Sequence, residues 1–431
     1  MAKQPLTKTI SDNYKIVNVL GEGSFGQVMK CVKVDTEDMV AVKVLKKRHS
    51  NHSHTREVYM LEKLRCLDLD KSNIIRCHET FSRRGHSFMV FEMLDLSVFD
   101  YIIQSGKSTL PLNGIKTIIR DVATALKALK GMGLIHTDLK LDNIMLVDHK
   151  RQPFRVKVID FGLTLEKTEV KRGLNVQPLW YRSPEVILGH RFTGAIDIWS
   201  LGNIMAEMLL GFTPFPGKHA YDVLRYIINL LGEPPKRLLN GGMSTKLFYK
   251  KSHRCYFFTY WKFKRPEEYF METGIKPMEL RRPRFFSLDQ LKILDKENTA
   301  DADERSDCVE LLKKMLQVDP RKRITPNKIL VDPFITLTHV RPYKNCGPLD
   351  VKNKITDSLR ATDGRDVISD PKAFMRDYDT ASDSSVEMDS ITKTIKARLP
   401  VKASDSNFSQ GSLCSPDAPD PKKKKRKKGI W

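Results

Sequence analysis

The chain has 431 residues, a formal net charge of +22 and 40% hydrophobic residues. A chain of this length is too long for a single hydrophobic core, which predicts two lobes and a further segment. The most apolar stretch, residues 195–211, carries Asp197 and Glu207 and is too short to span a bilayer, which predicts a buried core helix and no membrane contact. Seven cysteines without Cys-x-x-Cys spacing, after a polar start, predict reduced thiols in the cytosol or nucleus and argue against zinc.

After an N-terminal extension, residues 1–13, comes a glycine-rich pattern between two alternating segments. Residues 20–28 contain Gly-x-Gly-x-x-Gly-x-Val, and residues 14–20 and 28–34 alternate like strands. Dinucleotide-binding folds use a similar pattern, but there the glycines open a helix; a plain glycine-rich hairpin is the other alternative. We expect a hairpin whose backbone approaches phosphate groups. The residues concerned are Leu20, Gly21, Glu22, Gly23, Ser24, Phe25, Gly26, Gln27 and Val28.

The next strand pattern, Val40 to Lys43, ends in a lysine. An ammonium group in an apolar strand is costly unless it is paired, so we expect a carboxylate partner. Glu57 is the candidate, because it lies in a predicted helix over residues 55–67 with an apolar face at spacing three. Such a pair predicts that Lys43 binds the α- and β-phosphates of a nucleotide.

Helices are expected to dominate after the first 90 residues. Apolar residues recur at spacings of three and four over residues 112–129, directly after Pro111, which is typical of a helix start. Short strands first and helices later predict an α+β fold with a small β-rich part and a larger, mainly helical part.

The run His136-Thr137-Asp138-Leu139-Lys140-Leu141-Asp142-Asn143, followed by Asp160-Phe161-Gly162, indicates phosphoryl transfer. Asp138 would orient the attacking hydroxyl and accept its proton, and Lys140 would neutralise the γ-phosphate. Asn143 and Asp160 would hold magnesium. Chance occurrence is the alternative, and the ordered set of upstream motifs makes it weak.

This set of motifs resembles a eukaryotic protein kinase domain over about Tyr14 to Val340. Ser183-Pro184-Glu185 and the Asp197 run fit the same pattern, with Arg323 as the expected partner of Glu185. Within that family, several stretches resemble the homeodomain-interacting protein kinases, which share a group with cyclin-dependent and mitogen-activated kinases. These stretches are Val90 to Leu94, Leu134 to His136, Asn143 to Asp148, Arg151 to Ile159 and Leu312 to Leu316.

The resemblance implies a two-lobed fold, with an N-lobe over about 14–92 and a C-lobe over about 95–340. It implies ATP and Mg²⁺ as cofactors and protein substrates, with transcription regulators among the candidates. Ala41, Glu92 and Leu94 are expected at the adenine, with Phe91 as gatekeeper. Lys140 in Asp-Leu-Lys favours serine and threonine as acceptors, and dual specificity through autophosphorylation is an open alternative.

Three positions depart from the family pattern. Thr137 stands where most kinases have the arginine of His-Arg-Asp, and Asn175 stands where the nearest family has its autophosphorylated tyrosine. Leu179 replaces an arginine that helps shape the pocket for a proline after the acceptor. We therefore expect no dependence on activation-loop phosphotyrosine. The loop would be ordered by packing alone or, as the weaker alternative, through phosphorylation of Thr164 or Thr168.

Residues 232–291 are expected to form a long, irregular and basic insert that serves as a docking surface in this kinase group. Its aromatic residues could stack on nucleic acid, but we favour anchorage of the insert on the C-lobe. The aromatic residues are Tyr256, Phe257, Phe258, Tyr260, Trp261 and Phe263.

Residues 341–431 lack periodicity and read as a disordered tail. Seven consecutive basic residues, Lys422 to Lys428, predict binding to the nuclear import machinery and a nuclear location, with the cytoplasm as alternative.

Two other functions stay open beside an active kinase: a pseudokinase-like scaffold, and nucleic-acid binding by the basic surface. The scaffold is disfavoured because Lys43, Glu57, Asp138, Lys140, Asn143 and Asp160 are all present.

Overall fold

The structure is a computed structural model that describes residues 9–22, 26–45, 53–83, 85–255, 258–278, 287–293 and 299–336. Three residues of the glycine-rich run, Gly23, Ser24 and Phe25, lie outside these ranges, as do the expected tail and its basic run. The helices and strands predicted from the sequence can therefore be compared with the structure only between Thr9 and Thr336.

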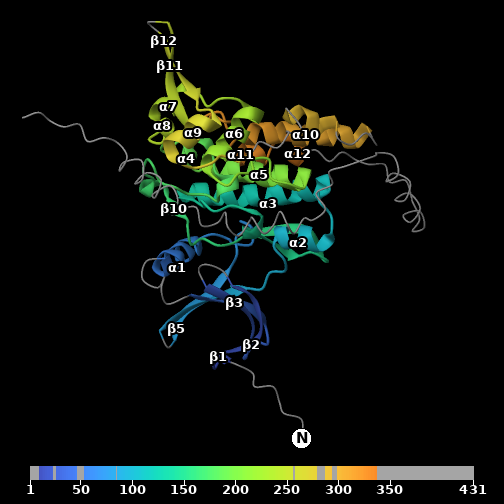
Figure 1. The fold of residues 1–431 in the computed structure, drawn as a ribbon. Helices are drawn as coiled ribbons and strands as arrows, with labels where there is room; N and C mark the ends of the chain where they lie inside the picture. The colour runs from blue at the N-terminus through green and yellow to red at the C-terminus, as the bar shows by residue number, and fades with distance from the viewer. Residues whose placement is uncertain are drawn as a thin grey trace, which may run out of the picture.

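The N-terminal part of the chain forms an antiparallel six-stranded sheet in the order β1-β2-β3-β4-β6-β5, which lies at the lower end of the molecule in Figure 1. The strands are β1 (Thr9–Ser11), β2 (Tyr14–Glu22), β3 (Gly26–Lys33), β4 (Met39–Leu45), β5 (Cys77–Arg83) and β6 (His86–Glu92). The predicted strands before and after the glycines are confirmed as β2 and β3, which pair as a hairpin.

Strand alternation decides which way Lys43 points. Along β4, Val40 and Val42 lie in a small cluster on one face of the sheet with Tyr14 and Phe88. The intervening residues face the other way, where helix α1 (Ser53–Leu64) packs through Met60, Leu61 and Leu64. The helix predicted over residues 55–67 is thus confirmed, although it begins two residues and ends three residues earlier than predicted. It covers the face on which Lys43 lies.

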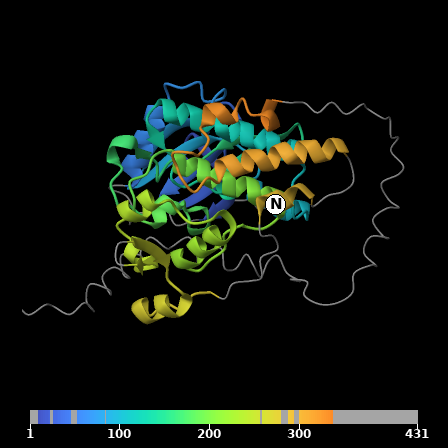
Figure 2. The ribbon, with the colours of Figure 1, turned by 90° about the horizontal axis from the view of Figure 1, so that it is seen from above.

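The helical part follows at the other end of the molecule and contains α2 (Val98–Ser105), α3 (Leu112–Gly131), α4 (Pro184–Ile187), α5 (Ala195–Leu210), α6 (Ala220–Leu231), α10 (Thr299–Met315), α11 (Pro326–Ile329) and α12 (Pro333–Thr336). Helix α5 is buried on nearly every side, as its almost continuous apolar sequence predicts. Helix α10 runs beside it, which is visible from above in Figure 2. No helix in the described ranges is long and apolar enough to cross a bilayer.

Short elements between the sheet and the helices carry the run His136 to Asn143, the candidate catalytic run. They are β7 (Leu134–Ile135), η2 (Leu141–Asn143), β8 (Ile144–Asp148), β9 (Gln152–Val158), β10 (Leu165–Glu166), η3 (Lys167–Glu169) and η4 (Leu179–Tyr181). Strands β8 and β9 form an antiparallel hairpin, so the chain turns back and brings Asp160 close to Asn143. Strand β10 pairs with β7 and ties the following segment to the same region.

The insert is more ordered than we expected. Instead of an irregular segment, it contains α7 (Lys236–Gly241), α8 (Thr245–Phe248), α9 (Pro266–Thr273), η5 (Leu288–Ile293) and the hairpin of β11 (Tyr249–Cys255) and β12 (Phe258–Phe263), which projects from the helices in Figure 1. Trp261 and Phe263 pack against the main core, and Phe263 stacks on Tyr221 at 5.0 Å between ring centroids, whereas Tyr260 is exposed. The favoured anchoring role is confirmed for these two aromatic residues, while Tyr256 and Phe257 lie outside the described ranges.

Candidate functional site

Lys43, the predicted phosphate-binding lysine, lies between two carboxylates. Lys43 Nζ is 2.8 Å and 3.0 Å from the two carboxylate oxygens of Glu57 on α1, and 3.5 Å from Asp160 Oδ1. Burial opposes protonation of Lys43, but the two neighbouring carboxylates outweigh it and raise its pKa. The same cation, with the Gly162 N–H, overcomes the effect of burial and lowers the pKa of Asp160. Three residues distant in sequence therefore form one charged cluster.

The second cluster joins Asp138 and Asn143. The Asn143 side-chain amide donates to both the backbone oxygen and the carboxylate of Asp138, each at 2.8 Å. Burial raises the pKa of Asp138 to about 6, and Lys140 acts against that rise. Asp138 thus stays mostly ionised at neutral pH and is close to the range in which a carboxylate accepts a proton efficiently.

Buried groups hold the backbone of the catalytic run in place. The Asp197 carboxylate at the start of α5 accepts from the N–H groups of His136 at 2.8 Å and Thr137 at 3.0 Å. Thr137 has a φ of +69°, an uncommon conformation for a β-branched residue. Its hydroxyl donates to the Leu163 oxygen at 2.7 Å, and so links the catalytic run to the residues after Asp160.

The described glycines of the glycine-rich run differ in their surroundings. A side chain at Gly26 would place its Cβ 2.0 Å from the Val44 oxygen, so the close approach of β3 and β4 requires glycine there. A Cβ at Gly21 would meet nothing within 4 Å. Among the described residues, none therefore requires a glycine at position 21 by close packing.

The expected hinge residues lie where the sheet passes into the helical part. The Glu92 carboxylate at the end of β6 accepts from buried Lys157 Nζ at 2.7 Å and from the Arg76 N–H at 2.7 Å. The carboxylate is thus engaged within the protein, and the Glu92 N–H also donates, to the Arg76 oxygen at 3.1 Å. Leu94 is buried, and Ala41 on β4 pairs in register with Phe91 on β6.

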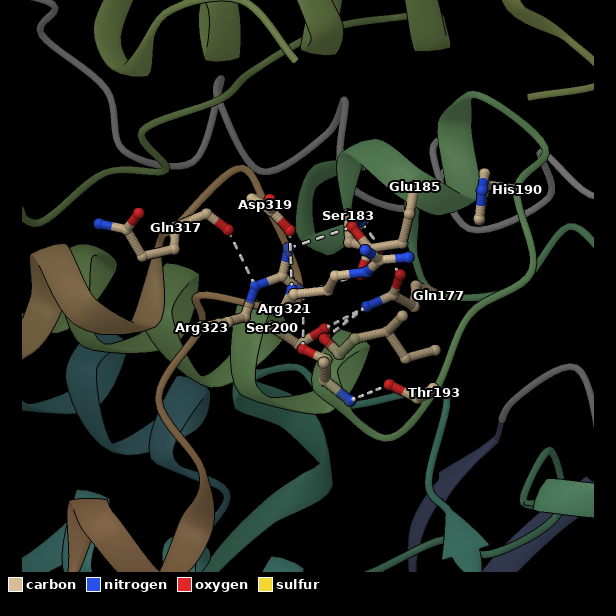
Figure 3. A network of polar contacts seen from close by, with 12 residues as sticks. Gln177, Ser183, Glu185, His190, Thr193, Ser200, Gln317, Asp319, Arg321 and Arg323 are labelled. Atoms are coloured by element: carbon tan, nitrogen blue, oxygen red, sulfur yellow. Dashed lines mark hydrogen bonds and ion pairs between the residues drawn. The ribbon is translucent and has the colours of Figure 1, made fainter. Parts of the chain in front are cut away.

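Polar contacts fix the segment before Ser183-Pro184-Glu185, as Figure 3 shows. Gln177, with a φ of +69°, donates to the Ile196 oxygen and to Ser200 Oγ, both at 2.9 Å, and accepts from the Ser183 N–H at 3.0 Å. Further along, the expected pair of Glu185 and Arg323 is confirmed at 2.7 Å, with side chains 1% and 0% exposed. The segment is therefore tied to α5 and to the loop before α11.

The three departures from the family pattern are all accommodated inside the fold. Leu179 is buried, and Arg182 donates to the backbone oxygens of Val176 at 3.0 Å and Gln177 at 2.8 Å. Asn175 is half-buried between Leu174 and Val176, which pack on an apolar cluster. Thr164 is fully buried and Thr168 is exposed, so Thr168 is the accessible one of the two expected acceptors in this conformation.

Three residues that contribute to the site were not singled out in the sequence. Gln177 gave no signal, because a positive φ outside glycine leaves no mark in composition. Arg56 and Glu169 form a bidentate ion pair between α1 and η3. Only the position of Arg56 beside Glu57 in a predicted helix could have drawn attention to it.

Comparisons with known proteins agree with this geometry. The protein kinase domain family matches residues 14–335. The chain is 42% identical over 343 residues to homeodomain-interacting protein kinase 1 of Rattus norvegicus, covering 78% of this chain and 28% of that protein. It is 40% identical to homeodomain-interacting protein kinase 2 of Mesocricetus auratus, covering 29% of it, and 36% identical to homeodomain-interacting protein kinase 4 of Homo sapiens, covering 56%.

The chain thus spans under a third of the first two relatives and about half of the third. The family match, in contrast, takes in every described residue of the two charged clusters, from Lys43 to Asp160, and most of the chain. The chain therefore belongs to the protein kinase family.

Proposed function

We propose that this protein is a serine/threonine protein kinase that transfers the γ-phosphoryl group of ATP to hydroxyl groups of protein substrates. The observation that carries the proposal is the position of Lys43 between Glu57 and Asp160, together with the contact between Asp138 and Asn143. The β-sheet and helical parts would then be the two lobes, with the site between them.

In this proposal Asp138 accepts the proton of the attacking hydroxyl, and its pKa of about 6 leaves it ionised at neutral pH. Lys43 binds the α- and β-phosphates while Glu57 fixes the ammonium group, and Lys140 binds the γ-phosphate. The backbone from Leu20 to Val28 covers the phosphates. Glu92 and Leu94 bind adenine through their backbone, with Ala41 against the ring.

Asp160 and Asn143 are the residues suited to hold Mg²⁺. The Asn143 amide nitrogen is engaged with Asp138, which leaves the amide oxygen as the atom for a metal, and Asp160 supplies a carboxylate. Oxygen ligands are those that Mg²⁺ prefers. Two protein ligands leave coordination positions that substrate phosphates would fill. When bound, Mg²⁺ neutralises charge on the phosphates.

The substrates we propose are nuclear regulators of transcription or signalling. Support comes from the names of the relatives, which describe them as homeodomain-interacting, and from the basic run Lys422 to Lys428. Fusing residues 415–431 to a fluorescent reporter should carry it into the nucleus. A cytoplasmic reporter would refute the import role of this run.

Proline after the acceptor is expected to matter less than in relatives with arginine at position 179. Leu179 is buried and apolar, so it cannot make charged hydrogen bonds that shape the proline pocket. Positional peptide arrays should show a weaker proline preference in the wild type than in Leu179→Arg. Equal proline preferences in the two proteins would show that Leu179 does not affect the choice of substrate.

Phosphate incorporation from [γ-³²P]ATP into a protein and peptide library tests the central proposal. Wild type should label serine and threonine, and Asp138→Asn should not, since the amide cannot accept the proton. Asp35→Asn removes an exposed carboxylate and serves as the matched control. Equal labelling by Asp138→Asn and Asp35→Asn would refute the assignment of Asp138.

A further inference from the structure

One edge of helix α1 binds the segment that follows Asp160. Arg56 lies directly before Glu57, and its guanidinium makes four hydrogen bonds to that segment. Arg56 Nε and Nη2 donate to the Thr164 oxygen at 2.9 Å and 2.7 Å, and Nη1 and Nη2 donate to the two Glu169 carboxylate oxygens at 2.9 Å and 2.6 Å. The fork of the guanidinium thus matches both a carbonyl and a carboxylate.

The Glu169 carboxylate is also held by a hydrogen bond within its own segment. Its Oε2 accepts the Glu166 N–H at 2.7 Å, which closes the short helix η3 and fixes the carboxylate where Arg56 reaches it. Hydrogen bonding to Arg56 is the main cause of the lowered pKa of Glu169, and Glu169 in turn raises the pKa of Arg56. Both groups are therefore charged at neutral pH.

A second pair strengthens the same contact. Glu166 Oε1 accepts from Lys63 Nζ at 2.6 Å and from the Tyr59 hydroxyl at 2.9 Å, and both donors lie on α1. The segment is anchored on its other side, because Leu165 pairs with Ile135 and the Lys167 N–H donates to the Gly133 oxygen at 2.8 Å. Helix α1 is thus bound to a segment that is itself fixed to the catalytic run.

We propose that Glu169 and Arg56 are positioning residues that hold helix α1 in the place where Glu57 meets Lys43, a task that a phosphorylated loop residue performs in other kinases. Glu166, with Lys63 and Tyr59, supports them. The inference rests on the proposed kinase function. It assigns to two carboxylates of the chain itself the negative charge that phosphorylation would add, and so explains how the segment is ordered without a phosphotyrosine at position 175.

The alternative is a solvent-exposed ion pair without consequence, since such pairs contribute little in general. Two observations argue against it. The Arg56 and Glu169 side chains are only 29% and 39% exposed, and the contact is bidentate with a backbone oxygen bound at the same time. An ordinary surface pair joins Glu62 on the same helix to Arg65, the residue after its end, with both side chains about half exposed.

The test compares variants of the full chain after phosphatase treatment, with removal of phosphate confirmed by intact mass. Glu169→Gln and Arg56→Gln each remove one charge and keep most of the shape, and Glu62→Gln is the matched control on the solvent side of α1. The readouts are kcat and KM for ATP, and amide hydrogen exchange of residues 53–64 without nucleotide. Exchange reports on α1 whether or not the protein transfers phosphate.

Each of the two variants should lower kcat by about fivefold to tenfold and accelerate exchange in α1, with a smaller change in KM. The double variant should be no worse than Arg56→Gln alone, because Glu169→Gln removes only an interaction that Arg56→Gln already removes. Arg56→Lys should recover part of the loss, whereas Glu62→Gln should match wild type. Wild-type exchange in Glu169→Gln, or additive losses in the double variant, would overturn the proposal.

If wild type itself transfers no phosphate, the kinase proposal fails. The exchange comparison then still decides whether Arg56 and Glu169 hold α1.

Discussion

The cluster around Lys43 and the segment from Val170 to Glu185 are neighbours, yet different forces hold them. In the cluster, buried charges face one another, with Lys43 between Glu57 and Asp160. In the segment, Val170, Leu174 and Val176 pack on an apolar cluster with Phe192 and Ile196, and a neutral amide, Gln177, makes the central hydrogen bonds. Charges in the first region would serve the proposed phosphoryl transfer, whereas apolar packing, neutral hydrogen bonds and the buried pair of Glu185 and Arg323 maintain the shape of the second. Substitutions in the two regions should therefore fail in different ways.

The largest expected effect is a loss of activity, without loss of the fold, when a residue of the charged cluster is replaced. Asp160→Asn and Lys43→Met should each lower kcat/KM by about 10³-fold or more, because each removes several kcal/mol of transition-state stabilisation. The unfolding midpoint of Asp160→Asn in denaturant should stay close to that of wild type, whereas Lys43→Met leaves buried Glu57 without its partner and should lower the midpoint while the protein still folds. Retained activity in both variants would contradict the roles of the two residues, and Asp35→Asn controls for loss of a carboxylate.

The second expected effect is a loss of stability in the segment from Val170 to Glu185. Arg323→Met leaves Glu185 buried without its partner, which should lower the free energy of unfolding by about 3–5 kcal/mol. Urea denaturation measures this loss, and exposed Arg321→Met is the control. A double variant, Glu185→Met with Arg323→Met, should recover part of the stability. If the single variant is as stable as the control, the pair does not anchor the segment.

The pH dependence of the reaction sharpens the comparison, because it tests the proposed base, Asp138. Asp138 must be unprotonated to accept a proton, and burial raises its pKa to about 6. The value of kcat/KM should therefore be level above about pH 7 and fall about tenfold per pH unit well below 6. Initial rates between pH 5 and 8 at constant ionic strength measure it. A profile that stays level down to pH 5 would contradict the raised pKa.

The smallest expected effect concerns phosphorylation of the segment. Protein treated with a tyrosine phosphatase should keep its activity, because Asn175 replaces the acceptor and packing already orders the chain there. Thr168→Ala, made together with Thr164→Ala, should change kcat by less than about threefold. Loss of activity after tyrosine dephosphorylation would show that packing and the carboxylates of the chain are not sufficient.

The sequence by itself determined the residue types and order of the charged clusters. Phosphoryl transfer demands a base, cations and oxygen ligands at set spacings, so Lys43, Glu57, Asp138, Asn143 and Asp160 could be named as candidate site residues before any coordinates. Helix α3 and the hairpin of β2 and β3 were predictable as well, because their apolar residues repeat at the period of the element itself.

Only the tertiary structure decided the rest. Arg56 and Glu169 are over a hundred positions apart, and with 74 basic and 52 acidic residues in the chain, no local pattern selects one such pair. The positive φ of Gln177 and the order within the insert depend equally on distant partners, Ser200 on α5 and Tyr221 on α6. Local periodicity records which face of an element is apolar, but the choice among many compatible partners is made when the whole chain packs.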